Sequence, residues 1–412
     1  MLSDAQKIIF DSIAAVLPDE AVRRALMGRR FPGRVVLVAI GKAAWRMAHA
    51  AHDALGYAVS RGVVITKYDH SQGPIGNLEI IESGHPVPDE NGIRGARHAL
   101  NLVSGLSPED TVLFLISGGG SALFELPLEG ATLDDIAALT RQLLACGADI
   151  TEINAIRKHL SAVKGGRFAK ACAPAHVLSV ILSDVLGDPI DAIASGPAAP
   201  DSSTCEDVFR IIEKYELSVP AHIRSLLKIE TPKQLDCVET MITGNVTALC
   251  DAAARSAKAL GYAPLVLTTM LSCEAREAGS MLASIAREIR RSGQPIKPPC
   301  ALITGGETVV HLRGSGKGGR NQELALSAAA GIAGLENTCI FSLGSDGTDG
   351  PTDAAGGIVT GAFCDACRKK GLSIDAALAN NDAYPLLKKM DALLETGPTG
   401  TNVNDVTVLL CR

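Results

Sequence analysis

Short aliphatic runs alternate with longer amphipathic stretches along the chain, and several of the runs end at glycine or serine. Arg34–Ile40 is such a run, closed by Gly41 and followed by a helical pattern over Ala43–Leu55. Thr111–Ile116 passes into a serine and three glycines, and His176–Leu182 passes into a serine and an aspartate. Strand, glycine and helix repeated in this order predict βα units and a parallel sheet.

The same pattern continues on both sides of a polar stretch at Ile229–Val238, which we predict to be a domain boundary. We therefore expect an N-terminal α/β domain over residues 1–235 and a C-terminal α/β domain over residues 236–412. Further strands are predicted at Gly62–Lys67, Leu78–Glu82, Thr240–Thr243, Leu265–Thr268, Cys300–Thr304, Thr308–Leu312, Cys339–Leu343 and Val406–Leu410. Further helices are predicted at Met1–Leu17, Asp89–Leu102, Leu133–Ala145, Thr151–Leu160, within Thr204–Leu227, and at Asn245–Leu260, Glu274–Arg291 and Arg320–Ala333.

Length and composition agree with two globular domains. The chain has 412 residues, more than the roughly 250–300 that one hydrophobic core usually spans. Aromatic residues make up only 3% against 47% hydrophobic residues, which favours aliphatic cores between helices and parallel strands. The net charge of −6 offers no basic face for a nucleic acid.

The cysteines and the apolar runs bear on the compartment. The 11 cysteines lack the spacing of a disulfide framework, so we expect free thiols in a reducing cytoplasm. No apolar run approaches the ~18 residues of a membrane-spanning helix. Met1–Leu17 carries three charged side chains and is expected to form an amphipathic helix rather than a signal peptide.

Candidate chemistry lies at strand ends, where open α/β sheets bind their ligands. One such segment consists of Ser117, Gly118, Gly119, Gly120 and Ser121. Its glycines allow close backbone approach, so the segment favours an anion site over a simple tight turn. Lys42 follows another strand end, where it either neutralises a phosphate or is an exposed surface lysine. Neither segment has the spacing of a dinucleotide fingerprint or a Walker A loop.

Carboxylates follow a third strand. Asp184 and Asp188 come directly after His176–Leu182. Two carboxylates in this place can hold Mg²⁺ or accept a hydroxyl proton, and they can also cap turns or helices. The length of the loop that carries them favours a functional role.

The second half contributes a glycine-rich loop and an acidic loop. Gly314–Arg320 enters a predicted helix with Lys317 and Arg320 at its mouth, a composition that favours anion binding over a flexible hairpin. Arg320 is placed to stabilise charge on a transferring phosphoryl group. Asp346 opens a loop of three aspartates, which either binds a cation or forms an acidic surface. Cationic and acidic groups beside glycine loops are the parts of metal-assisted phosphoryl transfer.

These segments resemble the class II glycerate kinases (glycerate 2-kinases), whose C-terminal half is called the MOFRL domain. Nearly the whole chain takes part in the resemblance. It rests on AIGKAAWRMA at Ala39–Ala48, SGGGSALFELP at Ser117–Pro127, INAIRKHLSAVKGGR at Ile153–Arg167, SDVLGDPIDAIASGP at Ser183–Pro197, GGETVVHLRGSGKGGRNQE at Gly305–Glu323 and SLGSDGTDGPTDAAG at Ser342–Gly356.

The resemblance implies two three-layer α/β domains, the N-terminal one with a Rossmann-like, mostly parallel sheet, and an active site in the cleft between them. It implies transfer of the ATP γ-phosphoryl group to the 2-hydroxyl of D-glycerate, with Mg²⁺ as the metal ion. Lys42 and Arg320 match the lysine and arginine that are catalytic in this family, and Asp184 is a third catalytic candidate. The binding candidates are Ser117, Gly118, Gly119, Gly120, Ser121, Asp188, Glu307, Lys317, Asn321 and Asp346, and the candidate metal ligands are Asp184, Asp188 and Asp346.

Two other functions stay open at this point. Members of the family are often labelled hydroxypyruvate reductases, and an NAD(P)H-dependent reductase is one alternative, although the dinucleotide fingerprint is missing. A non-catalytic sensor of a phosphorylated metabolite is the other. The expected partners are a small-molecule substrate and a nucleotide, without a nucleic acid or a membrane, and a homodimer is compatible with these features.

Overall fold

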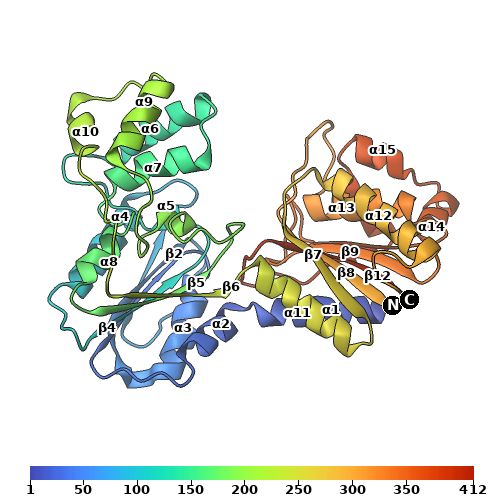
Figure 1. Ribbon diagram of the computed structural model, residues 1–412, viewed down its shortest axis with the longest axis horizontal. Coiled ribbons are helices and arrows are strands. Elements are labelled where there is room, and N and C mark those ends of the chain that lie inside the picture. The colour runs from blue at the N-terminus through green and yellow to red at the C-terminus, as the bar shows by residue number, and fades with distance from the viewer. The chain divides into compact units, whose positions relative to one another are not determined.

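The computed structural model describes residues 1–412, which fold into two compact units (Figure 1). Residues 18–243 form one of them, here called the central unit. Residues 1–17 and 244–412 form the other, the terminal unit. The predicted division placed residues 1–235 in one domain and residues 236–412 in the other, which differs from these two units. The first helix, α1 (Leu2–Ala15), packs on α11 (Val246–Ala259), with Ser256 Oγ donating to Asp11 Oδ2 at 2.7 Å.

The central unit is built on a six-stranded sheet in which β1 (Val35–Ile40) and β4 (Thr111–Ile116) are neighbours. The order across the sheet is β3 (Leu78–Ser83), β2 (Val59–Lys67), β1, β4, β5 (His176–Leu182) and β6 (Val238–Gly244). Strand pairs from β3 to β5 are parallel. This is the order of dinucleotide-binding folds, whose ligand crevice lies where the strand order reverses, between β1 and β4. The strand predicted at Thr240–Thr243 was assigned to the second domain, but it is the edge strand β6 of this sheet.

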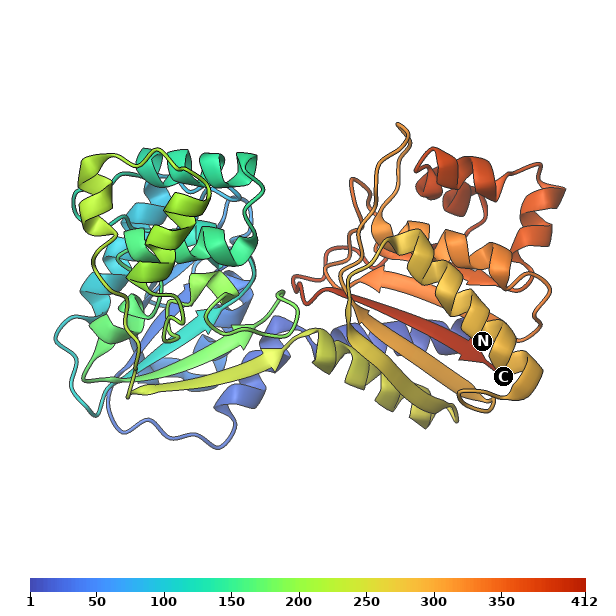
Figure 2. The ribbon, with the colours of Figure 1, turned by 45° about the horizontal axis from the view of Figure 1, so that its top comes forward.

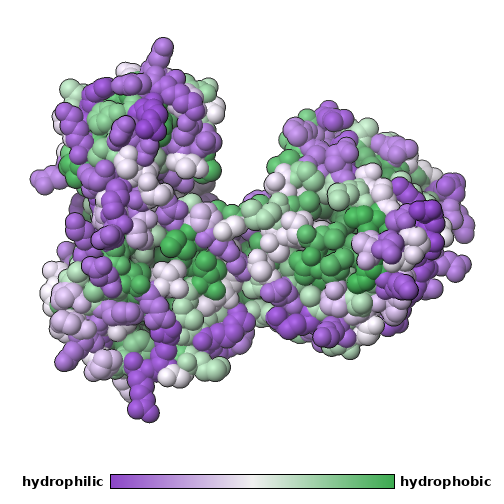
Figure 3. All heavy atoms as spheres, in the orientation of Figure 1, coloured by the Kyte–Doolittle hydropathy of each residue, from purple (hydrophilic) through white to green (hydrophobic).

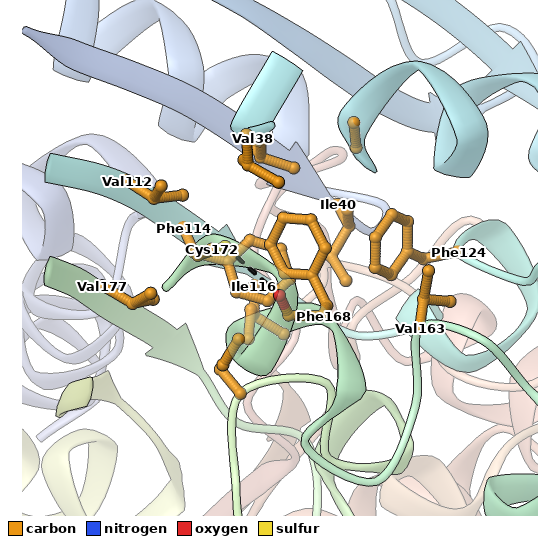
Figure 4. Close-up of a cluster of buried hydrophobic side chains, with 14 of the residues drawn as sticks. Val38, Ile40, Val112, Phe114, Ile116, Phe124, Val163, Phe168, Cys172 and Val177 are labelled. Carbon is orange, nitrogen blue, oxygen red and sulfur yellow. Dashed lines mark hydrogen bonds between the residues drawn. The ribbon is translucent and has the colours of Figure 1, made fainter. Parts of the chain in front are cut away.

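Successive side chains of a strand point to opposite faces of the sheet, and β1 and β4 are buried at every position. Helices therefore cover both faces of the central sheet. The helices of one face are α2 (Pro18–Leu26) and α3 (Ala44–Leu55), which pack on Leu37, Ala39, Leu113 and Leu115. Those of the other face are α4 (Glu90–Val103) and α8 (Arg167–Cys172). There Phe114, Phe124 and Phe168 pack in tilted and edge-to-face arrangements at centroid distances of 4.7–6.0 Å (Figure 4).

A cluster of helices with a core of its own stands beside the strands of the central unit (Figure 1). Its members are α6 (Leu133–Ala145), α7 (Ile150–Leu160), α9 (Cys205–Lys214) and α10 (Ala221–Leu226). Capping boxes at Thr132, Asp149 and Thr204 begin the first three, because each cap side chain accepts the N3 backbone N–H and the N3 carboxylate accepts the cap N–H. Short elements elsewhere in the unit are α5 (Gly120–Leu123) and 3₁₀ turns at Gly56–Ala58 and Ile193–Ser195.

The terminal unit has a mixed sheet of six strands. Its order is β11 (Leu393–Leu394), β10 (Gly356–Thr360), β9 (Thr338–Gly344), β12 (Asp405–Cys411), β8 (Cys300–Gly306) and β7 (Ala263–Leu271). Because β12 runs antiparallel to both of its neighbours, its first residue, Asp405, pairs with Gly344 and Gly306 at their carboxyl ends.

The helices α1 and α11 cover one face of this sheet, and α12 (Ala275–Ser292) and α13 (Arg320–Gly331) cover the other (Figure 2). The remaining helices are α14 (Phe363–Lys369), α15 (Ile374–Ala379) and α16 (Ala383–Lys389). The strand predicted at Thr308–Leu312 is wrong, since the segment forms a loop with a single bridge from Val309 to Glu274. Its β-branched residues favour a strand, but Leu312 and Val309 are exposed.

The predicted fold class is confirmed, because each unit has a sheet between helical layers. Polar residues cover most of the face in Figure 3, and hydrophobic residues reach the surface near the edge strand β7, where Leu267 and Met270 are exposed. None of the helices combines the length and the apolar composition that crossing a membrane requires.

Candidate active site

The ends of β1 and β4 are joined through the backbone, which fixes the position of Lys42. Its N–H donates to Gly118 O at 2.9 Å. Ser117 is buried, and its hydroxyl donates to Ile40 O at 3.2 Å and accepts from Ala43 N at 3.0 Å. The two predicted segments therefore lie together at the reversal of strand order, where this kind of sheet binds ligands.

Lys42, His85 and Asp184 gather around the glycines that follow β4. Gly119 has φ +85°, which favours glycine, and a Cβ there would stand 3.0 Å from the ring of His85 and 3.4 Å from Cε of Lys42. A Cβ on Gly118 would overlap the carboxylate of Asp184. The structure thus brings the predicted Lys42 and Asp184 together at the predicted glycines and adds His85, which is not among the predicted site residues.

His85 is held in its neutral form by its surroundings. Burial lowers the pKa of its imidazole, and the nearby charges of Lys42, Lys67 and His70 lower it further. A neutral imidazole can accept a hydrogen bond and can also donate one. The pair of Lys42 and His85 is therefore suited to hold an anionic ligand that also carries a hydroxyl group.

The loop after β5 has an unusual backbone that its surroundings hold in place. Ala194, Ser195 and Gly196 follow one another with φ of +51°, +62° and +63°. A non-glycine residue in this region costs about 1–3 kcal/mol and persists only where its neighbours impose it. Gly165 N donates to Ser195 O at 3.0 Å and Gly166 N donates to Gly196 O at 2.7 Å. The motif Ile153–Arg167, which contains Gly165 and Gly166, therefore supports this loop.

The same loop reaches the glycine segment through Ser195. Its hydroxyl lies 3.0 Å from that of Ser121 and donates to Asn154 Oδ1 at 3.4 Å. Arg157 of α7 donates to Ser121 O at 3.2 Å, so α7 helps to hold the Ser117–Ser121 segment in place. Asp188 lies earlier in the same loop, in a left-handed conformation with φ +53°.

A second polar group lies at the edge of the terminal sheet, around Arg320. Its guanidinium donates to both oxygens of Asp405, at 2.6 and 3.0 Å, and to Glu307 at 3.0 Å. Asp405 is 8% exposed and Arg320 34% exposed, so part of the guanidinium still faces solvent. Burial lowers the pKa of Arg320, but the hydrogen bonds and charge of Asp405 outweigh it and raise the pKa above its usual range.

Asp346 lies close to this group. A Cβ added at Gly344 would stand 3.4 Å from Oδ1 of Asp346 and 3.4 Å from Oδ1 of Asp405. Burial raises the pKa of Asp405, against the hydrogen bonds from Arg320. The sequence analysis missed Asp405 because it immediately precedes an aliphatic run and follows neither glycines nor a strand.

The start of α13 is occupied by a side chain of the protein itself. Asp349 accepts the N–H groups of Asn321 at 3.1 Å and Gln322 at 2.9 Å. A Cβ on Gly319 would overlap its carboxylate. Burial raises the pKa of Asp349 to about 7, although these hydrogen bonds lower it. The anion expected at this helix start is thus a carboxylate of the chain.

The other predicted residues of this half have partners within the unit. Lys317 Nζ lies 4.5 Å from the ring centroid of Tyr384. Asn321 is buried and accepts a hydrogen bond from Ser342 Oγ at 2.6 Å. The aspartates of the acidic loop are separated, since Asp353 accepts from Tyr384 at 2.7 Å while Asp346 accepts from its own turn.

Comparisons with known proteins agree over the length of the chain. The domain of unknown function DUF4147 matches residues 4–228, and the MOFRL family matches residues 300–405. The D-glycerate 2-kinase of Thermotoga maritima is 55% identical over 98% of this chain and 97% of that protein. The chain belongs to the glycerate 2-kinase family. The crystal structure of glycerate kinase from the same organism has a TM-score of 0.97 and 54% identity, covering 100% of this chain and 99% of that one.

The glycerate 2-kinase family also includes proteins under another name. A relative from Agrobacterium vitis, provisionally named hydroxypyruvate reductase, is 41% identical over 98% of this chain and 93% of its own length. The resemblance drawn from the six sequence motifs is confirmed by these matches.

Proposed function

We propose that this chain transfers the γ-phosphoryl group of ATP to the 2-hydroxyl of D-glycerate, giving 2-phosphoglycerate and ADP. The observation that carries the proposal is the group around Gly118 and Gly119, where Lys42, His85 and Asp184 surround bare backbone at the reversal of strand order. Such a group suits a small hydroxy acid or a phosphate, because it combines a cation, a neutral imidazole and a carboxylate. Membership of the glycerate 2-kinase family supports the reaction.

In the central unit, Lys42 neutralises an anionic oxygen while Ser117–Ser121 allow the ligand to approach the backbone. His85, being neutral, hydrogen-bonds to the ligand without adding charge. Asp184 acts at the hydroxyl that attacks, as its proton acceptor or as a ligand of a metal ion. Phosphoryl transfer needs little covalent chemistry from the protein, so positioning and charge stabilisation are the main tasks of these residues.

In the terminal unit, Arg320 stabilises charge on the transferring phosphoryl group with the part of its guanidinium that faces solvent. Asp405 and Glu307 hold the planar fork in one orientation. Lys317 adds positive charge at the same loop, and Asn321 is proposed to support the start of the helix. The groups proposed for phosphoryl transfer come from both units, and neither unit alone carries a complete set of them.

Mg²⁺ fits the donors that the chain offers. It prefers oxygen ligands and usually binds through one or two carboxylates together with substrate phosphates. Asp184, Asp188 and Asp346 are the proposed ligands, and all are carboxylates on loops that follow strands. When bound, the ion would neutralise charge on the β- and γ-phosphate oxygens.

The test is a turnover assay with the purified full chain. ADP release is measured with D-glycerate, L-glycerate and hydroxypyruvate, and phosphorus NMR distinguishes 2-phosphoglycerate from 3-phosphoglycerate. We expect ADP release with D-glycerate, and 2-phosphoglycerate as the product. ADP release without glycerate phosphorylation, or 3-phosphoglycerate as the main product, would contradict the proposal.

A reductase is the second candidate, because the central sheet has the strand order of dinucleotide-binding folds and one relative carries that name. The loop after β1 is Gly41-Lys42-Ala43, without the glycine spacing that admits a pyrophosphate. Loss of NAD(P)H absorbance with hydroxypyruvate would support the reductase. A non-catalytic sensor would bind ligand but would neither release ADP nor oxidise NAD(P)H. The homodimer remains a prediction, tested by the mass of the protein in solution.

A further inference from the structure

Three potential metal ligands meet in the helical cluster of the central unit, apart from the residues proposed for phosphoryl transfer. They are His159 near the end of α7, Cys205 at the start of α9 and Glu230 in the segment after α10. One ligand atom of each lies within 4.8 Å of the others. None of the three entered the sequence analysis, because they are 46 and 25 positions apart along the chain.

The hydrogen bonds of His159 fix which ring nitrogen carries a proton. Its Nδ1 lies 2.9 Å from Ala155 O. A carbonyl oxygen only accepts, so Nδ1 is the donor. Nε2 then faces Glu230 Oε1 at 3.2 Å. In a neutral imidazole this places two lone pairs opposite each other, and a cation must lie between them, either a proton on Nε2 or a metal ion.

We propose that His159 Nε2, Cys205 Sγ and the Glu230 carboxylate form a binding site for a thiophilic divalent cation, with Zn²⁺ as the reference ion. Nitrogen, sulfur and carboxylate ligands are those that Zn²⁺ takes in proteins, and three of them leave a fourth position for water. The hydrogen bond from Nδ1 to Ala155 O is of the kind that orients metal-binding histidines. On binding, the Cys205 thiol releases its proton to solvent, any proton on His159 Nε2 leaves with it, and no group changes oxidation state.

The burial of the ligands gives the ion one direction of approach. His159 is 0% exposed, while the side chain of Glu230 is 45% exposed. The ion therefore enters from the side of Glu230 and ends against the ring. There it would join α7, α9 and the segment at residue 230, so binding should raise the thermal stability of the protein.

Lys233 is the competing cation. Its ammonium lies 3.0 Å from Glu230 Oε1, and its side chain is 37% exposed. Lys233 also donates to Ser203 O and to Thr231 Oγ1, so it turns away from a bound ion at the cost of the ion pair and of these two hydrogen bonds. Removing it should therefore tighten metal binding. A purely structural role of the three residues predicts no such gain.

The test uses the full chain, reduced and freed of metals with a chelator, in excess Mg²⁺ so that carboxylate sites are filled. Co²⁺ is added as a spectroscopic probe, and Zn²⁺ then displaces it. We expect one equivalent of Co²⁺ with a thiolate-to-metal charge-transfer band, and a higher Tm. Cys205→Ser should lose the band and weaken Zn²⁺ binding at least about tenfold, the lower limit for disturbing an outer-shell partner. Cys237→Ser, at an exposed cysteine outside the cluster, should keep both.

Lys233→Ala should lower the Kd for Zn²⁺, and Glu230→Gln, at a half-exposed position, should raise it. Zn²⁺ binding of unchanged affinity in Cys205→Ser and Glu230→Gln would overturn the proposal. So would the absence of a charge-transfer band at one equivalent. Nitrogen NMR showing both ring nitrogens of His159 protonated, with no response to Zn²⁺, would identify the bridging cation as a proton.

Discussion

The polar groups of the two units differ in how their charges are balanced. In the central unit, Lys42 and a neutral His85 stand over bare glycine backbone. In the terminal unit, Arg320 is already paired with Asp405 and Glu307 within 3.0 Å. The first group is prepared to receive an anion. The second is neutralised in advance, so its arginine is held in a fixed orientation.

This difference assigns different tasks to two cations that look alike in the sequence. A lysine is a compact charge on a flexible stem, whereas arginine presents a planar fork that matches two oxygens at once. A fork held on one side by Asp405 can offer its remaining donors to a phosphoryl group without reorganising. Preorganised donors of this kind are a large source of transition-state stabilisation. We therefore expect Arg320 to act mainly on kcat and Lys42 to contribute to binding as well.

The largest effect is expected for Arg320→Lys. Lysine cannot keep both hydrogen bonds to Asp405 and still face the substrate, so kcat should fall by about 10³, the lower end of what a catalytic arginine supplies in phosphoryl transfer. Steady-state kinetics with D-glycerate and ATP measure this. Arg313→Lys makes the same change at an exposed position of the neighbouring loop and should leave kcat unchanged. Near-wild-type turnover in Arg320→Lys would show that the fork is not needed.

Lys42→Met should follow, with a loss of about 10²–10³ in kcat/KM, comparable to the removal of one charge-stabilising donor. Methionine keeps the length of the side chain over Gly119 and removes the charge. The backbone bond from residue 42 to Gly118 remains, so the fold should persist. Lys170→Met, at an exposed position of α8, serves as the control. An unchanged KM for both substrates, with all of the loss in kcat, would remove Lys42 from binding.

Gly119→Val separates backbone strain from obstruction of the site. Gly147 also has a positive φ, +72°, but a Cβ there meets nothing within 4 Å, whereas at Gly119 it meets His85. Gly147→Val therefore serves as the control. Gly119→Val and Gly147→Val should each lose about 1–2 kcal/mol of stability from the left-handed conformation. Only Gly119→Val should also lose the rise in Tm that ligand binding produces. If both variants keep that rise, the glycine segment is a turn and not a binding site.

Asp349→Asn should have the smallest effect on turnover and a clear effect on pH dependence. Because burial raises the pKa of Asp349 to about 7, the folded protein holds a proton that the unfolded chain has lost. The free energy of unfolding should therefore decrease as pH rises from about 4 to about 7. In Asp349→Asn this slope should be weaker, as measured by urea unfolding at several pH values. Identical slopes in the two proteins would assign the proton to another group.

Much of the architecture follows from the sequence, because strands and helices here have regular patterns. Thr111–Ile116, Leu133–Ala145 and His176–Leu182 have the predicted bounds. The prediction of a strand at Thr308–Leu312 was wrong, since β-branched residues alone cannot say whether a neighbouring strand exists to pair with them. Strand Val238–Gly244 was assigned to the second domain, but it belongs to the central sheet, because membership of a sheet depends on long-range pairing.

The candidate site residues that follow a glycine or a strand end could be predicted from the sequence, and the others could not. Lys42 and Asp184 stand beside a glycine run and a strand end, and both signals are local. His85 and Asp405 were not predicted as site residues, because each becomes part of a polar group only when distant strands are placed side by side. The role of Asp349 was hidden for a different reason. A helix start attracts anions whether they come from a ligand or from the chain itself.

The attachment of α1 to the terminal unit has a consequence for how the protein is made. The ribosome releases this helix before residues 18–243, and its partner α11 only after all of them. At the usual speed of translation that interval lasts on the order of ten to fifty seconds. During it the apolar side of the helix, with Ile8, Ile9 and Ile13, has no native surface to cover it. The nascent chain therefore offers chaperones an early binding segment. A fusion to the start of α1 would disturb the packing of the terminal unit, most of which is synthesised after residue 243.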